Sequence, residues 1–249
     1  YVSSQFLNMR RQSSTGNRNI SRTIRTEVGG DDGVWFINPF EINNLDGDQI
    51  YVPTRSKVFR STNAGDTWES LTDVIPGEQF SVGLSSSTNP IAYIGGTASR
   101  LYYVENAATS VAGDELPVWD PQNLPNRAFL GGTIGCIEVD PTDETTIYCG
   151  FVNIDTDSRI WRIRHANSDS AQYDDIGANL PESVPVNWIE VDPEMTDHIL
   201  IGTDYGLYTS LNAGQSWQKE ERFPNVPVDQ VRLRHSDRKL FIYTHGRGI

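Results

Sequence analysis

The chain has 249 residues, of which 33 are acidic and 20 are Lys or Arg, so its formal net charge at neutral pH is −13. A nucleic-acid partner is disfavoured, because phosphate backbones bind clusters of basic side chains. Membrane insertion is also not expected, because no segment approaches the roughly 20 consecutive apolar residues that cross a bilayer.

Strands are predicted along the whole chain by short β-branched or aromatic runs bounded by Gly, Pro, Asn or Asp. In chain order these runs form sets: 40–42, 50–52 and 57–60; 81–84, 92–95 and 101–104; 137–139, 147–150 and 160–163; 189–191, 199–202 and 206–209; and finally 231–233 and 240–243. Residues 1–4 match the second run of a set. No window shows a sustained period of 3.6 residues, so we expect no long helix.

An internal repeat underlies these sets. The sequence IEVDP occurs at 137–141 and again at 189–193, an offset of 52 residues. Units of short strands that repeat every 40 to 50 residues are typical of β-propeller blades, whose small sheets bury their faces by stacking around an axis. We therefore expect an all-β chain of four-stranded blades with boundaries near 1–28 (partial), 29–76, 77–126, 127–182, 183–225 and 226–249 (partial).

The two partial blades do not combine into one, because joining them would supply the second strand twice. The expectation is therefore that the chain is an incomplete portion of a larger propeller of about seven blades.

Two segments share one motif. The sequences STNAGDTW at 61–68 and SLNAGQSW at 210–217 both fit S-x-[DN]-x-G-x-[ST]-W and both follow a predicted strand. Asn and Ser side chains bond the backbone of tight turns, and Gly permits a positive φ. The motif suits a hairpin between outer strands, with Trp covering the apolar space between blades.

This motif resembles the Asp-box, or bacterial neuraminidase repeat, of sialidases, xyloglucanase-type glycoside hydrolases, sortilin-like receptors and secreted propeller proteins of Bacteroidetes-type bacteria. The resemblance implies a secreted or cell-surface location. It also implies a structural role for the motif residues, which are Ser61, Asn63, Gly65, Thr67, Trp68, Ser210, Asn212, Gly214, Ser216 and Trp217.

Catalytic motifs are not found. The Arg-Ile-Pro type motif that opens sialidase domains does not occur, there is no G-x-S-x-G nucleophile elbow, and the four histidines lack metal-ligand spacing. Acids are plentiful, yet nothing in the sequence pairs two of them as glycoside hydrolysis requires. Asp140 and Asp192 begin tight turns before proline, where a structural role is expected. No cofactor and no metal is expected, and the catalytic residues stay unknown.

Ligand-binding candidates are few. Asp204 lies in a turn between a second and a third strand, and His245 and Arg247 lie between glycines that allow close backbone approach. Cys136 and Cys149 lie in runs that fall nearly opposite each other if they pair as a hairpin, so either a cross-strand disulfide or two buried free thiols is possible.

The expected function is a non-catalytic interaction or scaffold module of a larger protein, which binds a protein or polysaccharide ligand or other domains of the same protein. The alternative is a glycoside hydrolase or polysaccharide-binding module of xyloglucanase type, in which Trp35, Trp161 and Trp188 stack on sugars instead of packing between blades. A sortilin-like peptide receptor is a third possibility.

Overall fold

The computed structural model describes the chain except for residues 15, 119–131, 153–158, 235 and 246–249. Two compact units make up the chain, residues 1–117 and 118–249, and each is described by itself. No helix among the described residues has the length and apolar character needed to span a bilayer.

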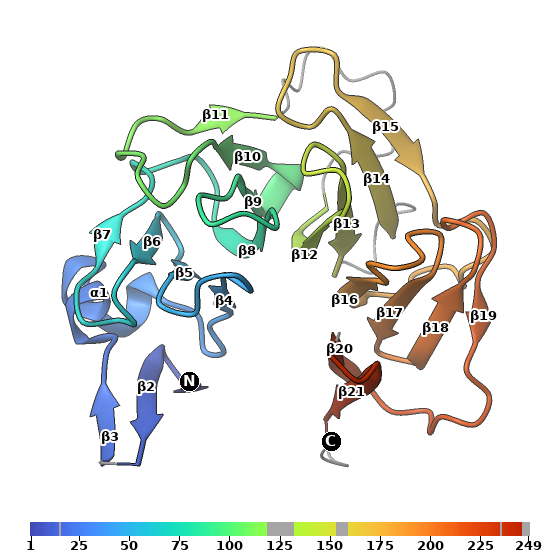
Figure 1. Cartoon of the computed structure of the whole chain (residues 1–249), viewed down its shortest axis with the longest axis horizontal. Helices are drawn as coiled ribbons and strands as arrows, with labels where there is room; N and C mark the ends of the chain where they lie inside the picture. Colours follow the sequence, from blue (N-terminus) through green and yellow to red (C-terminus); the bar gives the residue numbers. More distant parts are fainter. Residues whose placement is uncertain (15, 119–131, 153–158, 235, 246–249) are drawn as a thin grey trace. The chain divides into compact units, whose positions relative to one another are not determined.

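Three antiparallel sheets form the first unit (Figure 1). The first sheet contains β1 (Val2–Ser4), β2 (Asn8–Ser13) and β3 (Gly16–Asn19), followed by the short helix α1 (Arg22–Glu27) and the 3-10 turn η1 (Gly30–Gly33). The second contains β4 (Glu41–Ile42), β5 (Ile50–Pro53), β6 (Val58–Ser61) and β7 (Glu69–Ser70). The third contains β8 (Gln79–Leu84), β9 (Ala92–Gly96), β10 (Leu101–Val104) and β11 (Leu116–Pro117), with the 3-10 turn η2 (Thr97–Ser99) before β10.

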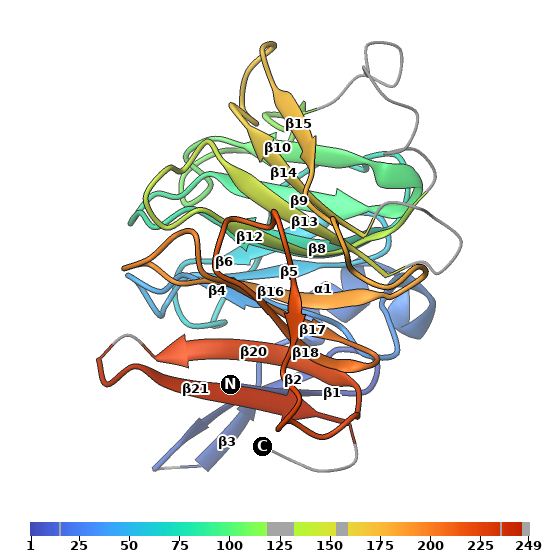
Figure 2. The ribbon, with the colours of Figure 1, turned by 90° about the vertical axis from the view of Figure 1, so that its right-hand side faces the viewer.

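The described residues of the second unit also form three antiparallel sheets (Figure 2). Its first sheet contains β12 (Ile134–Val139), β13 (Ile147–Phe151), β14 (Ile160–Arg164) and β15 (Gln172–Asp175). The next contains β16 (Val186–Val191), β17 (Ile199–Thr203), β18 (Gly206–Ser210) and β19 (Gln218–Lys219), and the last is the pair β20 (Val228–Arg234) and β21 (Lys239–Thr244). The predicted all-β class with four-stranded antiparallel sheets is confirmed, whereas the number of blades and their boundaries stay predictions.

Four apolar clusters of the described residues each join two neighbouring sheets of one unit. In the first unit, Met9 and Ile24 pack with Phe59, and Tyr51 packs with Ile94. In the second unit, clusters join β12–β15 to β16–β19 and β16–β19 to β20–β21. Stacked neighbours therefore bury the apolar faces that a single small sheet leaves in water, where burial is worth about 25 cal/mol per Å².

A β-bulge recurs where the first strand of a sheet pairs with the second. The registers of β8 with β9, β12 with β13, β16 with β17 and β20 with β21 each skip one residue. The extra residues are Phe80, Gly135, Asn187 and Asp229. A bulge re-aims the side chain of its extra residue, so these positions matter for the candidate site below.

The two cysteines are free and buried, so the disulfide considered from the sequence is wrong and the alternative of buried thiols holds. The register pairs Cys149 with Ile137, and Cys136 with Gly150. Paired residues share a face and successive residues alternate faces, so the two thiols project from opposite faces of the sheet. The bulge before Cys136 sets this register, and burial raises the pKa of both thiols.

Candidate functional site

The two Ser-x-Asn turns have the same hydrogen bonds. In the first turn, Ser61 Oγ accepts the Gly65 N–H at 2.8 Å and donates to Asn63 Oδ1, which in turn accepts the Thr67 N–H at 2.8 Å. In the second turn, Ser210 Oγ accepts the Gly214 N–H at 2.9 Å, and Asn212 Oδ1 accepts the Ser216 N–H at 2.9 Å. The polar side chains of both turns are therefore used within the turns.

Each turn also attaches to the preceding sheet. Trp68 Nε1 donates to the carbonyl of Ile20, which follows β3, and Trp217 Nε1 donates to the carbonyl of Ile176, which follows β15. Gly214 has a φ of +83°, and a Cβ there would lie 2.7 Å from Ile176. These contacts connect one sheet to the next at their outer strands.

Asp140 and Asp192 have local partners. Asp140 Oδ1 accepts the N–H of Thr142 at 2.9 Å within its turn. Asp192 is buried and receives two hydrogen bonds from the guanidinium of Arg238 in the β20–β21 turn. These bonds hold the pKa of the Asp192 carboxyl well below its usual range. Since the folded-state pKa is the lower one, the pair stabilises the fold above the ordinary aspartate pKa and loses this effect as the pH falls toward the folded value.

The sequence candidates Asp204 and His245 lie in one polar cluster of the second unit. Asn187 Nδ2 donates to Asp204 Oδ1 at 2.9 Å and to the carbonyl of Val228 at 3.3 Å. Asp229, the next residue after Val228, has its Oδ2 3.9 Å from His245 Nδ1. We call Asn187, Asp204, Asp229 and His245 the bulge patch, because Asn187 and Asp229 are the bulge residues of neighbouring sheets. Arg247 lies outside the described residues.

The electrostatics of the bulge patch centre on Asp229. Partial burial raises the pKa of its carboxyl, His245 lowers it, and the charge of Asp204 raises it. The side chains of Asp229 and His245 are nevertheless 58% and 81% exposed. Water reaches both groups, which suits reversible binding of a polar ligand better than acid–base catalysis in a shielded site.

Sequence reasoning missed Asn187 and Asp229. The signal was present, since both residues follow a Val at the start of a first strand, Val186 and Val228. Recognising it required the bulge register, which places these residues outside the regular alternation of the strand.

The tryptophans considered for sugar stacking are covered. The Trp35 ring has the Arg55 guanidinium 4.0 Å from its centroid and the Phe80 ring at 4.0 Å. Arg232 lies 4.5 Å over the ring of Trp188, and Trp161 is only 2% exposed. Tyr205 is different, because it is 50% exposed and follows Asp204 directly.

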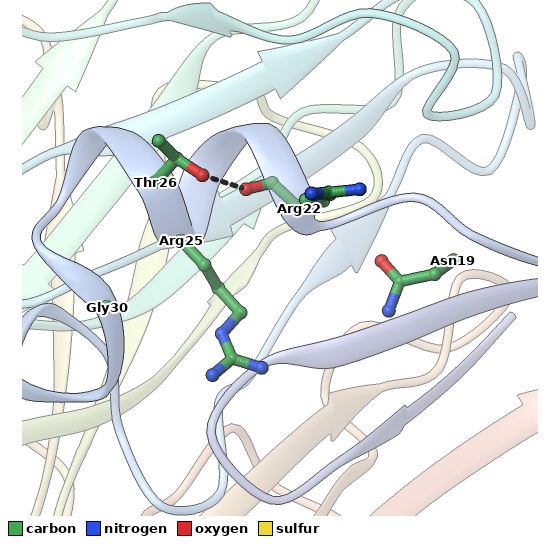
Figure 3. A pocket seen from close by; sticks show the side chains of 5 residues that line it. All are labelled: Asn19, Arg22, Arg25, Thr26 and Gly30. Atoms are coloured by element: carbon green, nitrogen blue, oxygen red, sulfur yellow. Dashed lines mark hydrogen bonds between the residues drawn. The ribbon is translucent and has the colours of Figure 1, made fainter.

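An open hollow of about 510 Å³ lies in the first unit (Figure 3). Asn19, Arg22, Arg25, Thr26 and Gly30 line it. Among the described residues, no group of three His, Cys, Asp or Glu side chains is placed to hold a metal ion.

No protein-family model and no curated protein matches the sequence. Among solved structures, the chain is similar to the β-propeller domain of Cps50 (Swd1) from Myceliophteria thermophila, at 11% identity and a TM-score of 0.60 over 84% of this chain and 62% of that one. It is similar to YCF48 bound to D1 peptide, at 14% identity and a TM-score of 0.53 over 80% and 58% of the two chains. It is also similar to the GH74 xyloglucanase from Xanthomonas campestris, at 14% identity and a TM-score of 0.52 over 94% and 32%.

These similarities, together with the stacked antiparallel sheets, define the class of protein: the chain has a β-propeller fold. It spans less than two thirds of the length of each of these three structures. These three propellers include one bound to a peptide, YCF48, and a GH74 xyloglucanase, so the fold alone does not determine the activity.

Proposed function

We propose that this chain is part of an Asp-box propeller that acts as a non-catalytic interaction module of a secreted or cell-surface protein. Its partner is a protein or polysaccharide ligand, or another domain of the same protein. The observation that supports this function most directly is the bulge patch, in which two carboxylates, an amide and an imidazole stand together and open to water. The two Ser-x-Asn turns, which have the same pattern of hydrogen bonds, support the Asp-box assignment.

Within this proposal the bulge patch is the binding surface. Asp204 and Asp229 make it acidic, and their carboxylates accept hydrogen bonds from ammonium, guanidinium or hydroxyl groups. The exposed ring of Tyr205 adds apolar area beside them.

The test uses two peptides of equal length, one rich in Lys and one rich in Glu. We expect the cationic peptide to bind. The double variant Asp204→Asn, Asp229→Asn should lower the affinity for this peptide about ten-fold. Asp197→Asn is the matched control, because this exposed residue lies in the turn at the other end of β17. If the control variant lost as much affinity for the cationic peptide, the attraction would be diffuse and electrostatic. This result would contradict a binding site at the bulge patch.

The alternative, a glycoside hydrolase of xyloglucanase type, is favoured by the proximity of Asp204 to Asp229 and by the raised pKa of Asp229. Its test is the release of reducing ends from xyloglucan. We expect none above the level of the Asp229→Asn variant. Release by the unmodified chain that disappears in this variant would replace the proposed function with the enzymatic one.

A further inference from the structure

Positive charge is segregated at the start of this acidic chain. Residues 1–26 contain five arginines and no Asp or Glu, whereas residues 27–249 contain 15 basic and 33 acidic residues, a net charge of −18. The arginines lie on β2, β3 and α1, all in the first unit. This segment therefore has the electrostatic character opposite to that of the rest of the chain.

Not all of these arginines are neutralised. Arg11 and Arg18 both pair with Asp66, and Arg25 pairs with Asp31. Arg22 is exposed and, within the part of the chain that the structure describes, its side chain has no ion pair. Arg22 and Arg25 are three residues apart, so both lie on the same side of α1, while the buried Ile24 faces the core.

Arg22 and Arg25 both line the open hollow, and Figure 3 shows their side chains leaving α1 in different directions. Asn19 and Thr26 line it with them, and the Thr26 hydroxyl donates to the carbonyl of Arg22 at 3.0 Å, which leaves its oxygen able to accept a hydrogen bond. Asn19 is held in place, because its Nδ2 donates to Asn8 Oδ1 at 2.7 Å and its Oδ1 accepts the Ser21 N–H. The hollow thus combines two donors suited to a carboxylate with an amide and a hydroxyl suited to neutral hydroxyl groups.

We propose that this hollow is a second binding site, which takes a carboxylate-bearing saccharide such as a uronic acid unit. The ligand carboxylate pairs with the guanidinium of Arg22 and with that of Arg25 after Arg25 has left Asp31 and turned toward it, and the sugar hydroxyls bond Asn19 and Thr26. The volume of about 510 Å³ falls within the range of small-ligand sites. This site lies in the first unit and does not depend on the bulge patch.

The neighbouring acids favour a singly charged ligand. Asp31 and Asp32 follow Gly30 directly, so a doubly charged phosphate meets more repulsion than a carboxylate. The carboxylate of Asp31 already forms an ion pair with Arg25, and the Asp31 side chain is 55% exposed. Asp31 therefore acts as an internal competitor that the ligand displaces from Arg25.

The test is calorimetric titration with the methyl glycoside of galacturonic acid, which carries one carboxylate, and, as the uncharged match, its methyl ester. We expect the acid to bind and the ester to bind at least about ten-fold more weakly, since the ester cannot form charged hydrogen bonds with the guanidinium groups. We expect Arg22→Gln to weaken the binding of the acid about ten-fold, and Asp31→Asn to strengthen it a few-fold. Arg18→Gln is the control, because this arginine belongs to the same basic segment but does not line the hollow.

Four results would overturn the proposal. They are no binding of the acid to the unmodified chain, equal binding of the ester, equal losses in Arg18→Gln and Arg22→Gln, and competition by inorganic phosphate at the same concentration. Circular dichroism of each variant checks its fold, which Arg22→Gln is expected to leave intact because this exposed side chain has no ion pair among the described residues.

Discussion

The buried hydroxyl of Ser210 offers a direct test of how the Ser-x-Asn turns stabilise the sheets. Ser210 is 1% exposed, and its Oγ accepts the buried N–H of Gly214 at 2.9 Å. In Ser210→Ala this N–H loses its acceptor and stays buried, which costs about 1–3 kcal/mol. We expect a loss of about 2 kcal/mol in the free energy of unfolding, which corresponds to a fall in Tm of roughly 4–8 °C for a chain of this size.

The matched control is Ser216→Ala in the same turn. Its hydroxyl accepts only the exposed hydrogen bond from Asn212 Nδ2, which water can replace. We expect a change below about 0.5 kcal/mol. Thermal unfolding followed by circular dichroism measures both variants, and hydrogen exchange at Gly214 reports the lost bond directly. Equal losses in the two variants, or no loss in Ser210→Ala, would refute the reasoning.

Two further predictions concern contacts between neighbouring sheets of the second unit. In Gly202→Ala the new Cβ would lie 2.7 Å from Val228 Cγ1 and 2.9 Å from its backbone oxygen, so we expect a loss of about 1–3 kcal/mol in urea unfolding. Gly47→Ala meets no atom within 4 Å, and an equal loss there would contradict the steric explanation. In Arg238→Gln the carboxyl of Asp192 loses its main partner, which raises its folded-state pKa. The urea midpoint should therefore fall most above pH 5, and the difference from the unmodified chain should shrink as the pH falls below about 4; a difference that does not depend on pH would argue against this.

The strands could be predicted because the sequence repeats its own pattern. The runs at 137–139 and 189–191 lie in β12 and β16, and the pairs Ile137 with Cys149 and Ile189 with Ile201 have the same register. Short β-branched runs separated by turn residues are a local signal, so they need no knowledge of the distant chain.

Register details could not be predicted in the same way. The relative facing of Cys136 and Cys149 depends on one extra residue at Gly135. Because the side-chain period of a strand is two, a shift of one residue moves a side chain to the other face. Asp204 was identified as a candidate from its turn, but the bulge residue Asp229, which lies beside His245, was not, since the Val before it marks the skipped position only once the bulge register is known.

The recurring bulge explains how one scaffold can carry different surfaces. At the same position in four sheets the extra residue is Phe80, Gly135, Asn187 or Asp229, while the buried strands around it keep their alternation. Phe80 stacks on Trp35, whereas Asn187 bonds Asp204 and Asp229 lies beside His245. The bulge residue is released from the regular pleat, so its side chain is not one of the alternating core positions of the strand. We therefore expect binding specificity to depend on the bulge residues, and stability to depend on the Ser-x-Asn turns and on the close packing of Gly202 against Val228.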